Sequence, residues 1–133
     1  MDGEQLERAL AHYTGSETFT RYSPLFRNVL LTDGALFLAK EAGAFWLMDL
    51  IASHQISPKL QTERHRSFQN WTLTVNDDGS ADARMSDEGK TIVAQHVEHT
   101  DFPLKSIQLF ACGQPGDDDE DENYLVIMLP SEY

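Results

Sequence analysis

The 133-residue sequence has one cysteine, few basic residues and no long hydrophobic stretch. Cys112 cannot form an internal disulfide and its apolar neighbours favour a buried side chain, so we expect a reducing, cytoplasmic setting. The uninterrupted apolar runs fall far short of the roughly 20 residues that span a bilayer. The first four residues show neither the basic nor the apolar region of a secretion signal. We therefore expect a soluble protein with no membrane partner.

The motifs of the commonest enzyme classes are also missing. The sequence contains no G-x-S-x-G elbow of hydrolases, no G-x-x-x-x-G-K-[ST] phosphate loop and no G-x-G-x-x-G dinucleotide turn. His96 and His99 are three residues apart, and on a strand such side chains point to opposite faces, so this pair predicts no metal site. We therefore predict a non-enzymatic protein with no metal and no cofactor.

Basic residues are scarce, since 22 acidic residues stand against 10 basic ones and give a net charge of -12. Such a charge disfavours direct binding to nucleic acid or to an anionic membrane. The one basic cluster, Lys59, Arg64 and Arg66, precedes Phe68 and Trp71, a combination found in some nucleic-acid readers. Because the global charge opposes that function, we predict a solvated connector here and no direct nucleic-acid binding.

Half of the net charge lies in one acidic run near the C-terminus. The run consists of Asp117, Asp118, Asp119, Glu120, Asp121 and Glu122. We predict that it binds a protein with a basic surface. A solvated hairpin tip and a weak divalent-cation site are alternatives, although the run lacks the alternating ligands of a calcium loop. A further alternative is a nucleic-acid mimic that inhibits a DNA- or RNA-processing machine, but mimicry requires carboxylates spread at phosphate-like spacing.

The N-terminal part of the chain shows helical patterns. Asp2 and Gln5 form a capping box, and the helix that follows should end at Thr14-Gly15. Its apolar face contains Leu6, Ala9, Leu10 and Tyr13. The apolar residues 25–31 fit either a strand or a helix.

The central stretch, residues 32–55, begins with a cap at Thr32 or Asp33 and is strongly apolar. If the helix runs unbroken through Gly43, Asp49 faces the core and its pKa rises unless a donor is supplied. If Gly43 breaks the helix, the register resets and that inference no longer holds. We expect Asp49 to bond a backbone amide, an arginine or a tryptophan ring nitrogen. The alternative is a small enzyme that uses Asp49, with His54, for acid and base catalysis.

From Phe68 onward the apolar period changes from helical to alternating. Trp71, Leu73 and Val75 share one face of a strand, and Ala81, Ala83 and Met85 share one face of the next. Further strands are expected at residues 91–98, 106–112 and 123–129. We predict one α+β domain, with a helical part at about residues 1–56 and a sheet part at about residues 67–133. The N-terminal helices should pack on one face of a four- to five-stranded, mostly antiparallel sheet. If residues 123–129 form an edge strand, pairing between two copies makes a homodimer possible.

Two blocks of the sequence resemble a known family. The more specific block runs from Thr32-Asp33-Gly34 to Trp46-Leu47 and Asp49, and the other is the turn Thr100-Asp101-Phe102-Pro103. They resemble a family of small bacterial and mobile-element proteins that is described only as a domain of unknown function. The segment 113–122 departs from that pattern because it is long and unusually acidic. The resemblance implies no activity and no site residues, but it favours a mobile-element or host-interaction role.

Overall fold

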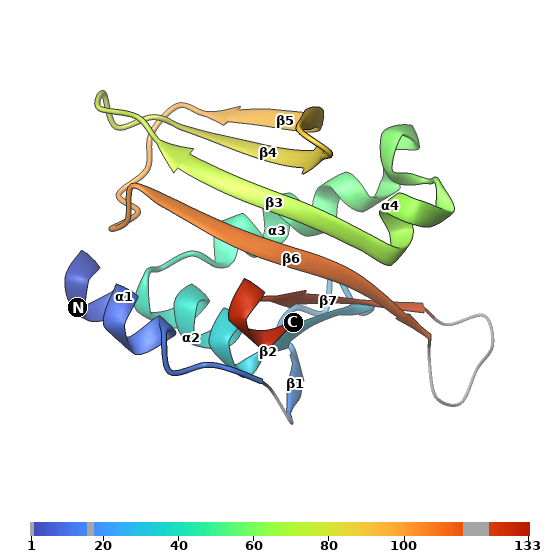
Figure 1. The fold of residues 1–133 in the computed structure, drawn as a ribbon, viewed down its shortest axis with the longest axis horizontal. Helices are drawn as coiled ribbons and strands as arrows, with labels where there is room; N and C mark the ends of the chain where they lie inside the picture. Colours follow the sequence, from blue (N-terminus) through green and yellow to red (C-terminus); the bar gives the residue numbers. More distant parts are fainter. Residues whose placement is uncertain (1, 16–17, 116–122) are drawn as a thin grey trace.

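The computed structural model describes residues 2–15, 18–115 and 123–133, which form a mixed β-sheet with helices (Figure 1). In this part of the chain seven strands follow the spatial order β1-β2-β7-β6-β3-β4-β5. Their bounds are Phe19–Arg21 (β1), Val29–Thr32 (β2), Phe68–Val75 (β3), Ala81–Asp87 (β4), Lys90–Val97 (β5), Ser106–Pro115 (β6) and Asn123–Met128 (β7). The pairing of β2 with β7 is parallel, and the other pairings are antiparallel.

Four helices and three short 3-10 turns accompany the sheet in the described residues. The helices are α1 (Gly3–Leu10), α2 (Asp33–Glu41), α3 (Phe45–Ser53) and α4 (Glu63–Ser67), and the turns are η1 (His54–Ile56), η2 (Pro58–Leu60) and η3 (Pro130–Glu132). The capping box of Asp2 and Gln5 is confirmed. However, α1 ends before the predicted Thr14-Gly15, because His12 and Tyr13 make i to i−3 hydrogen bonds of 3.2 and 3.1 Å instead of helical ones. No helix in the described ranges is long and apolar enough to span a membrane.

The main core lies between helices and one face of the sheet. Buried side chains of α1, α2 and α3 pack with Trp71 and Leu73 of β3 and with inward-facing residues of β2, β4, β6 and β7. The alternating patterns predicted for β3 and β4 are confirmed, since Trp71, Leu73, Ala81, Ala83 and Met85 are all buried. A smaller cluster on the other face contains Cys112, Val126 and Met128. Cys112 is therefore a buried packing residue.

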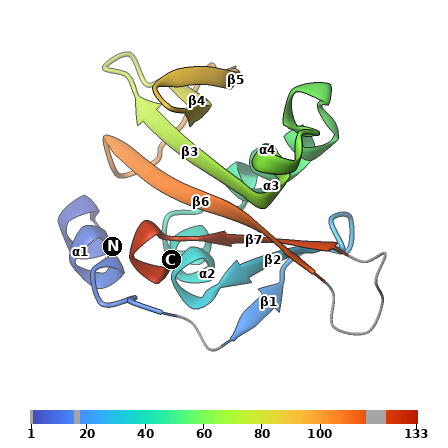
Figure 2. The same ribbon diagram turned by 45° about the vertical axis from the view of Figure 1, so that its right-hand side comes forward.

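The sheet is larger than the sequence predicted. The prediction of four to five strands is wrong, because β1 and β2 lie in the part of the chain that was expected to be helical. The ambiguous residues 25–31 contain a turn and the start of β2. The expected edge strand at residues 123–129 is also wrong, because β7 lies between β2 and β6, and β1 and β5 are the edges (Figure 2). A homodimer through an exposed β7 edge is therefore not available.

Gly43 separates the central stretch into two helices. Its φ of +59° lies in the left-handed region, which ends α2 and lets α3 begin two residues later. The register consequently resets, and α3 buries Leu47, Met48 and Ile51 while Asp49 is exposed. The condition for a core-facing Asp49, an unbroken helix through Gly43, is therefore not met, and the alternative of two helices is confirmed.

Candidate functional site

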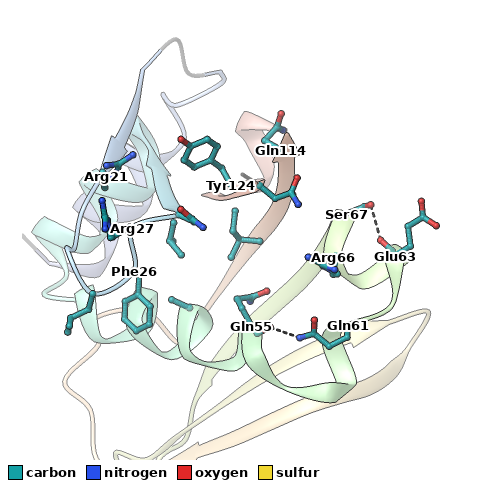
Figure 3. Close-up of a pocket in the computed structure, with 17 residues that line it drawn as sticks. Arg21, Phe26, Arg27, Gln55, Gln61, Glu63, Arg66, Ser67, Gln114 and Tyr124 are labelled. Atoms are coloured by element: carbon teal, nitrogen blue, oxygen red, sulfur yellow. Dashed lines mark hydrogen bonds between the residues drawn. The ribbon is translucent and has the colours of Figure 1, made fainter. Parts of the chain in front are cut away.

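A cleft of about 1130 Å³ opens at one end of the sheet (Figure 3). Its walls come from β1 and the β1–β2 loop, from α4, and from the neighbouring ends of β6 and β7. Residues at the end of α3 and in η1 form its floor. Segments that are far apart in the sequence thus meet here, which only the strand order of the sheet makes possible.

Three of the six arginines line this cleft, which we call the arginine cleft. Arg21 and Arg27 lie together on one wall, and Arg66 faces them from the other (Figure 3). Within the residues that the structure describes, none of the three makes an ion pair or a side-chain hydrogen bond. Glu63 is the one carboxylate among the lining residues. Among the described residues, the lining of the cleft therefore carries more positive than negative charge, in a strongly acidic protein.

The wall that carries Arg21 and Arg27 is held by β-pairing and by a serine turn. Arg21 lies opposite Leu30 in the antiparallel pair of β1 and β2. In the loop that follows, the Ser23 hydroxyl accepts a hydrogen bond from the Leu25 amide at 3.2 Å. At the end of the loop, the carbonyl of Asn28 accepts from the Leu125 amide of β7 at 2.8 Å. These contacts fix the backbone from which both arginines extend.

The opposite wall, α4, is fixed by the residues before Arg66. Thr62 caps the helix, and Arg64 and His65 contact the Asp87 carboxylate of β4 at 2.7 and 3.0 Å. The hydrogen bond from Arg64, followed by that from His65, lowers the pKa of Asp87 below its usual value, so the carboxylate stays charged. Gly113 of β6 packs directly against the carbonyl of Arg66, where a larger residue has no room. Arg64 is thus tied to β4, whereas Arg66 points into the cleft.

A buried carboxamide network holds the floor of the cleft. Gln69 of β3 is fully buried, and its side chain exchanges two hydrogen bonds with Gln55, at 2.7 and 2.9 Å. The Gln69 side chain also accepts from the Trp71 ring nitrogen at 2.9 Å and donates to the His65 carbonyl at 2.9 Å. The indole of Trp71 therefore bonds Gln69 and not Asp49. Gln55 lines the cleft, so this network connects the cleft floor to the core.

Other carboxamides around the cleft have unused hydrogen-bonding groups. The side chains of Asn28, Gln114 and Asn123 form no hydrogen bond within the described ranges, and all three line the cleft. Gln61 uses its amide nitrogen in bonds to the carbonyls of Gln55 and Ser57, which leaves its oxygen available. The arginine cleft therefore offers both donors and acceptors to a ligand.

Asp49 and His54 lie outside the arginine cleft, and each bonds a different partner. Asp49 accepts a hydrogen bond from the Tyr22 hydroxyl at 3.0 Å. Burial, and then the bond to Asp49, raise the pKa of Tyr22 well above its usual value, so this phenol stays protonated as the donor. The Nε2 atom of His54 lies 2.7 Å from the side-chain oxygen of Gln95. The geometry therefore assembles no acid–base pair from Asp49 and His54.

A shallower groove of about 520 Å³ runs beside Asp49. We call it the apolar groove. Its lining consists of the apolar residues Leu25, Phe26, Trp46, Leu50 and Val97 together with Asp49, Ser53, Gln95 and His96. Leu25 and Phe26 also line the arginine cleft, so the groove and the cleft adjoin through these two side chains.

Three other sites were considered in the sequence: the acidic run, the histidine pair and the basic cluster. The acidic run, residues 117–122, lies outside the described residues. His96 contacts Asp82 at 2.8 Å, and His99 lies beside Gly79. Across residues 2–15, 18–115 and 123–133, no group of three or more His, Cys, Asp or Glu side chains is placed to hold a metal ion. The basic cluster separates, because Arg64 pairs with Asp87 and only Arg66 reaches the cleft.

Comparison with known proteins defines the family but no activity. No curated protein and no solved structure matches the chain. The model of DUF6876, a family of unknown function, matches residues 4–133. This match covers nearly the whole chain. The protein is therefore a member of the DUF6876 family.

Proposed function

We propose that the protein is a non-enzymatic binding protein whose arginine cleft takes an anionic ligand. The observation that carries this proposal is the gathering of Arg21, Arg27 and Arg66 without an acidic partner in the described residues, although the chain has 22 acidic residues. Three like charges around one cavity repel one another, and an anion relieves that repulsion. The guanidinium group suits carboxylates and phosphates because its donors form paired, charge-assisted hydrogen bonds.

The net charge of the chain restricts the size of the ligand. A long polyanion such as nucleic acid extends beyond the cleft and meets the field of a protein with a charge of -12. Exposed charges farther away than the Debye length, about 8 Å at physiological salt, are largely screened. Among the described residues, a short anion inside the cleft therefore meets mainly the three arginines and one carboxylate, Glu63. The proposed ligand is a short carboxylate- or phosphate-bearing molecule.

The cleft arginines should control anion affinity. We expect Arg27→Gln and Arg66→Gln each to weaken binding of citrate or pyrophosphate about tenfold, because each removes charge-assisted hydrogen bonds. Isothermal titration calorimetry at low salt measures the affinities. Arg8→Gln is the matched control, since Arg8 is exposed on α1 and its contact with Glu4 is 3.8 Å long. Equal weakening in the control, or no anion binding by the unchanged protein, would contradict the proposal.

The acidic run supports a second binding function of opposite charge. Six consecutive carboxylates supply half of the net charge, and we propose that they attract a protein with a basic surface. A nuclease or another DNA-binding protein as the partner would favour the nucleic-acid mimic. The single buried cysteine supports a cytoplasmic setting for this encounter, and a host-interaction role on a mobile element agrees with it.

Neutralising the acidic run should abolish capture of this partner. We expect a variant with Asn and Gln at residues 117–122 to lose a bacterial protein that the unchanged chain retains at low salt and releases at high salt. Affinity capture followed by mass spectrometry measures this, and circular dichroism checks the fold. A control variant neutralises six separate exposed acids: Glu4, Glu7, Glu41, Asp77, Glu98 and Asp101. If the run variant still captures the partner, or the control loses it equally, the run is not the docking site.

A further inference from the structure

The arginine cleft and the apolar groove adjoin, and together they combine two kinds of surface. The cleft supplies three arginines and one carboxylate, Glu63, and the groove supplies apolar side chains of α3 and β5 beside the carboxylate of Asp49. Leu25 is 86% exposed where the two meet, and Phe26 beside it is half-buried. A ligand that follows this path meets positive charge first and an apolar surface next.

We infer that the ligand is a short, extended acidic peptide that carries a large apolar side chain. Its carboxylates contact Arg21, Arg27 and Arg66, and its apolar side chain covers Leu25 and enters the apolar groove. This inference rests on the proposed anion-binding function and names the class of ligand. Charge complementarity selects the acidic part, and the adjoining groove selects the apolar part.

The carboxamides of the cleft favour a peptide over an acyl chain with a charged head. Asn28, Gln114 and Asn123 each present a donor and an acceptor that no described residue uses. The three side chains are exposed, and a peptide bond offers each of them a matching donor and acceptor, which an acyl chain does not. The polar lining thus matches a peptide backbone between the anionic and apolar ends.

Fluorescence anisotropy with defined peptides tests this inference. The main probe is a labelled, end-capped peptide with three glutamates beside one leucine. A second peptide has glutamine in place of glutamate, a third has serine in place of leucine, and decanoate is a competitor. We expect the second and third peptides to bind at least about tenfold more weakly than the main probe. We also expect decanoate not to displace the main probe.

Leu25→Ser separates the peptide inference from anion binding. This variant should weaken the main probe about fivefold and leave the citrate affinity unchanged, because Leu25 contributes only apolar surface. Ile56→Ser is the matched control, since Ile56 is 88% exposed and lines neither cavity. If citrate binds but the leucine and serine peptides bind equally, the peptide inference fails and the anion proposal stands. The peptide inference also fails if decanoate displaces the main probe from the unchanged protein but not from Leu25→Ser. That result would identify the ligand as an amphipathic acid. If neither citrate nor any peptide binds, both fail.

Discussion

Replacing Gln69 with leucine should lower the free energy of unfolding by about 3–4 kcal/mol, because buried polar partners then lose their hydrogen bonds. The Gln69 side chain makes four hydrogen bonds, two of them with Gln55. Leucine has a similar volume but neither donor nor acceptor, so the indole N–H of Trp71, which is 2% exposed, loses its partner inside the core. Urea unfolding followed by circular dichroism measures the change.

The control for this prediction is Gln108→Leu. Gln108 is exposed on β6 and donates one hydrogen bond, of 2.8 Å, to Asn70. Its replacement should change stability by no more than about 0.5 kcal/mol, as is usual for surface sites. A second measurement follows the indole N–H resonance of Trp71, which should shift in Gln69→Leu and not in the control. Equal destabilisation of the two variants would show that the buried network contributes little to stability.

The sequence predicts those helices and strands whose residue pattern depends only on neighbours in the chain, such as β3, β4 and the start of α1. β3 and β4 alternate because one face of each packs against the helices, so their inward apolar residues could be recognised in advance, whereas the buried Gln69 of β3 could not. The cap of α1 is equally local, because Asp2 and Gln5 bond each other's backbone amides. A glycine at position 43 allows either one unbroken helix or two separate helices. Only its positive φ in the structure decides for two.

The arrangement of the sheet depends on long-range pairing that the sequence does not encode locally. β1 and β2 have three and four residues, too few for a periodic pattern. β7 was expected at an edge, yet its apolar run from Leu125 to Met128 suits a strand with neighbours on both sides. Because β2 pairs with β7 in parallel, the N-terminal part of the chain covers that edge.

The candidate site was missed for the same reason. Arg21 and Arg27 belong to β1 and its loop, and Arg66 belongs to α4, so no sequence motif connects them. In the sequence, Arg66 belongs to a basic cluster that predicts only a solvated connector, and the predicted binding function lies on the acidic run. The one feature of the sequence that could have indicated this site is the small number of arginines in an acidic chain. Their positions around one cleft depend on β1 and β7 lying on either side of β2.

The Thr32-Asp33-Gly34 block, which carries the family resemblance, has a structural explanation at the start of α2. The Thr32 hydroxyl caps the helix by accepting from the Ala35 amide at 3.3 Å and donates to the Glu132 carboxylate at 2.7 Å. The same carboxylate accepts from the amides of Gly34 and Leu129, both at 3.0 Å. Glu132 therefore joins the C-terminal turn η3 to the positive end of α2.

Gly34→Ala should destabilise the protein by about 2–3 kcal/mol, although alanine normally favours a helix over glycine. A methyl group at Gly34 would lie 2.5 Å from the Glu132 carboxylate oxygen and 2.6 Å from a methyl of Leu129. The carboxylate cannot move aside without breaking its bonds to Thr32, Gly34 and Leu129. Thermal and urea unfolding measure the loss.

A double-mutant cycle identifies the cause of that loss. In a Glu132→Ala background the carboxylate is absent, so Gly34→Ala should cost only about 1 kcal/mol, the remainder arising from the crowded Leu129 methyl. Gly15→Ala is the control for general effects of the substitution, because no atom lies within 4 Å of a methyl placed there. Its stability should change by no more than about 0.5 kcal/mol. Simple additivity of the Gly34 and Glu132 substitutions would refute the close-contact explanation, because the conflict with the carboxylate exists only while Glu132 is present.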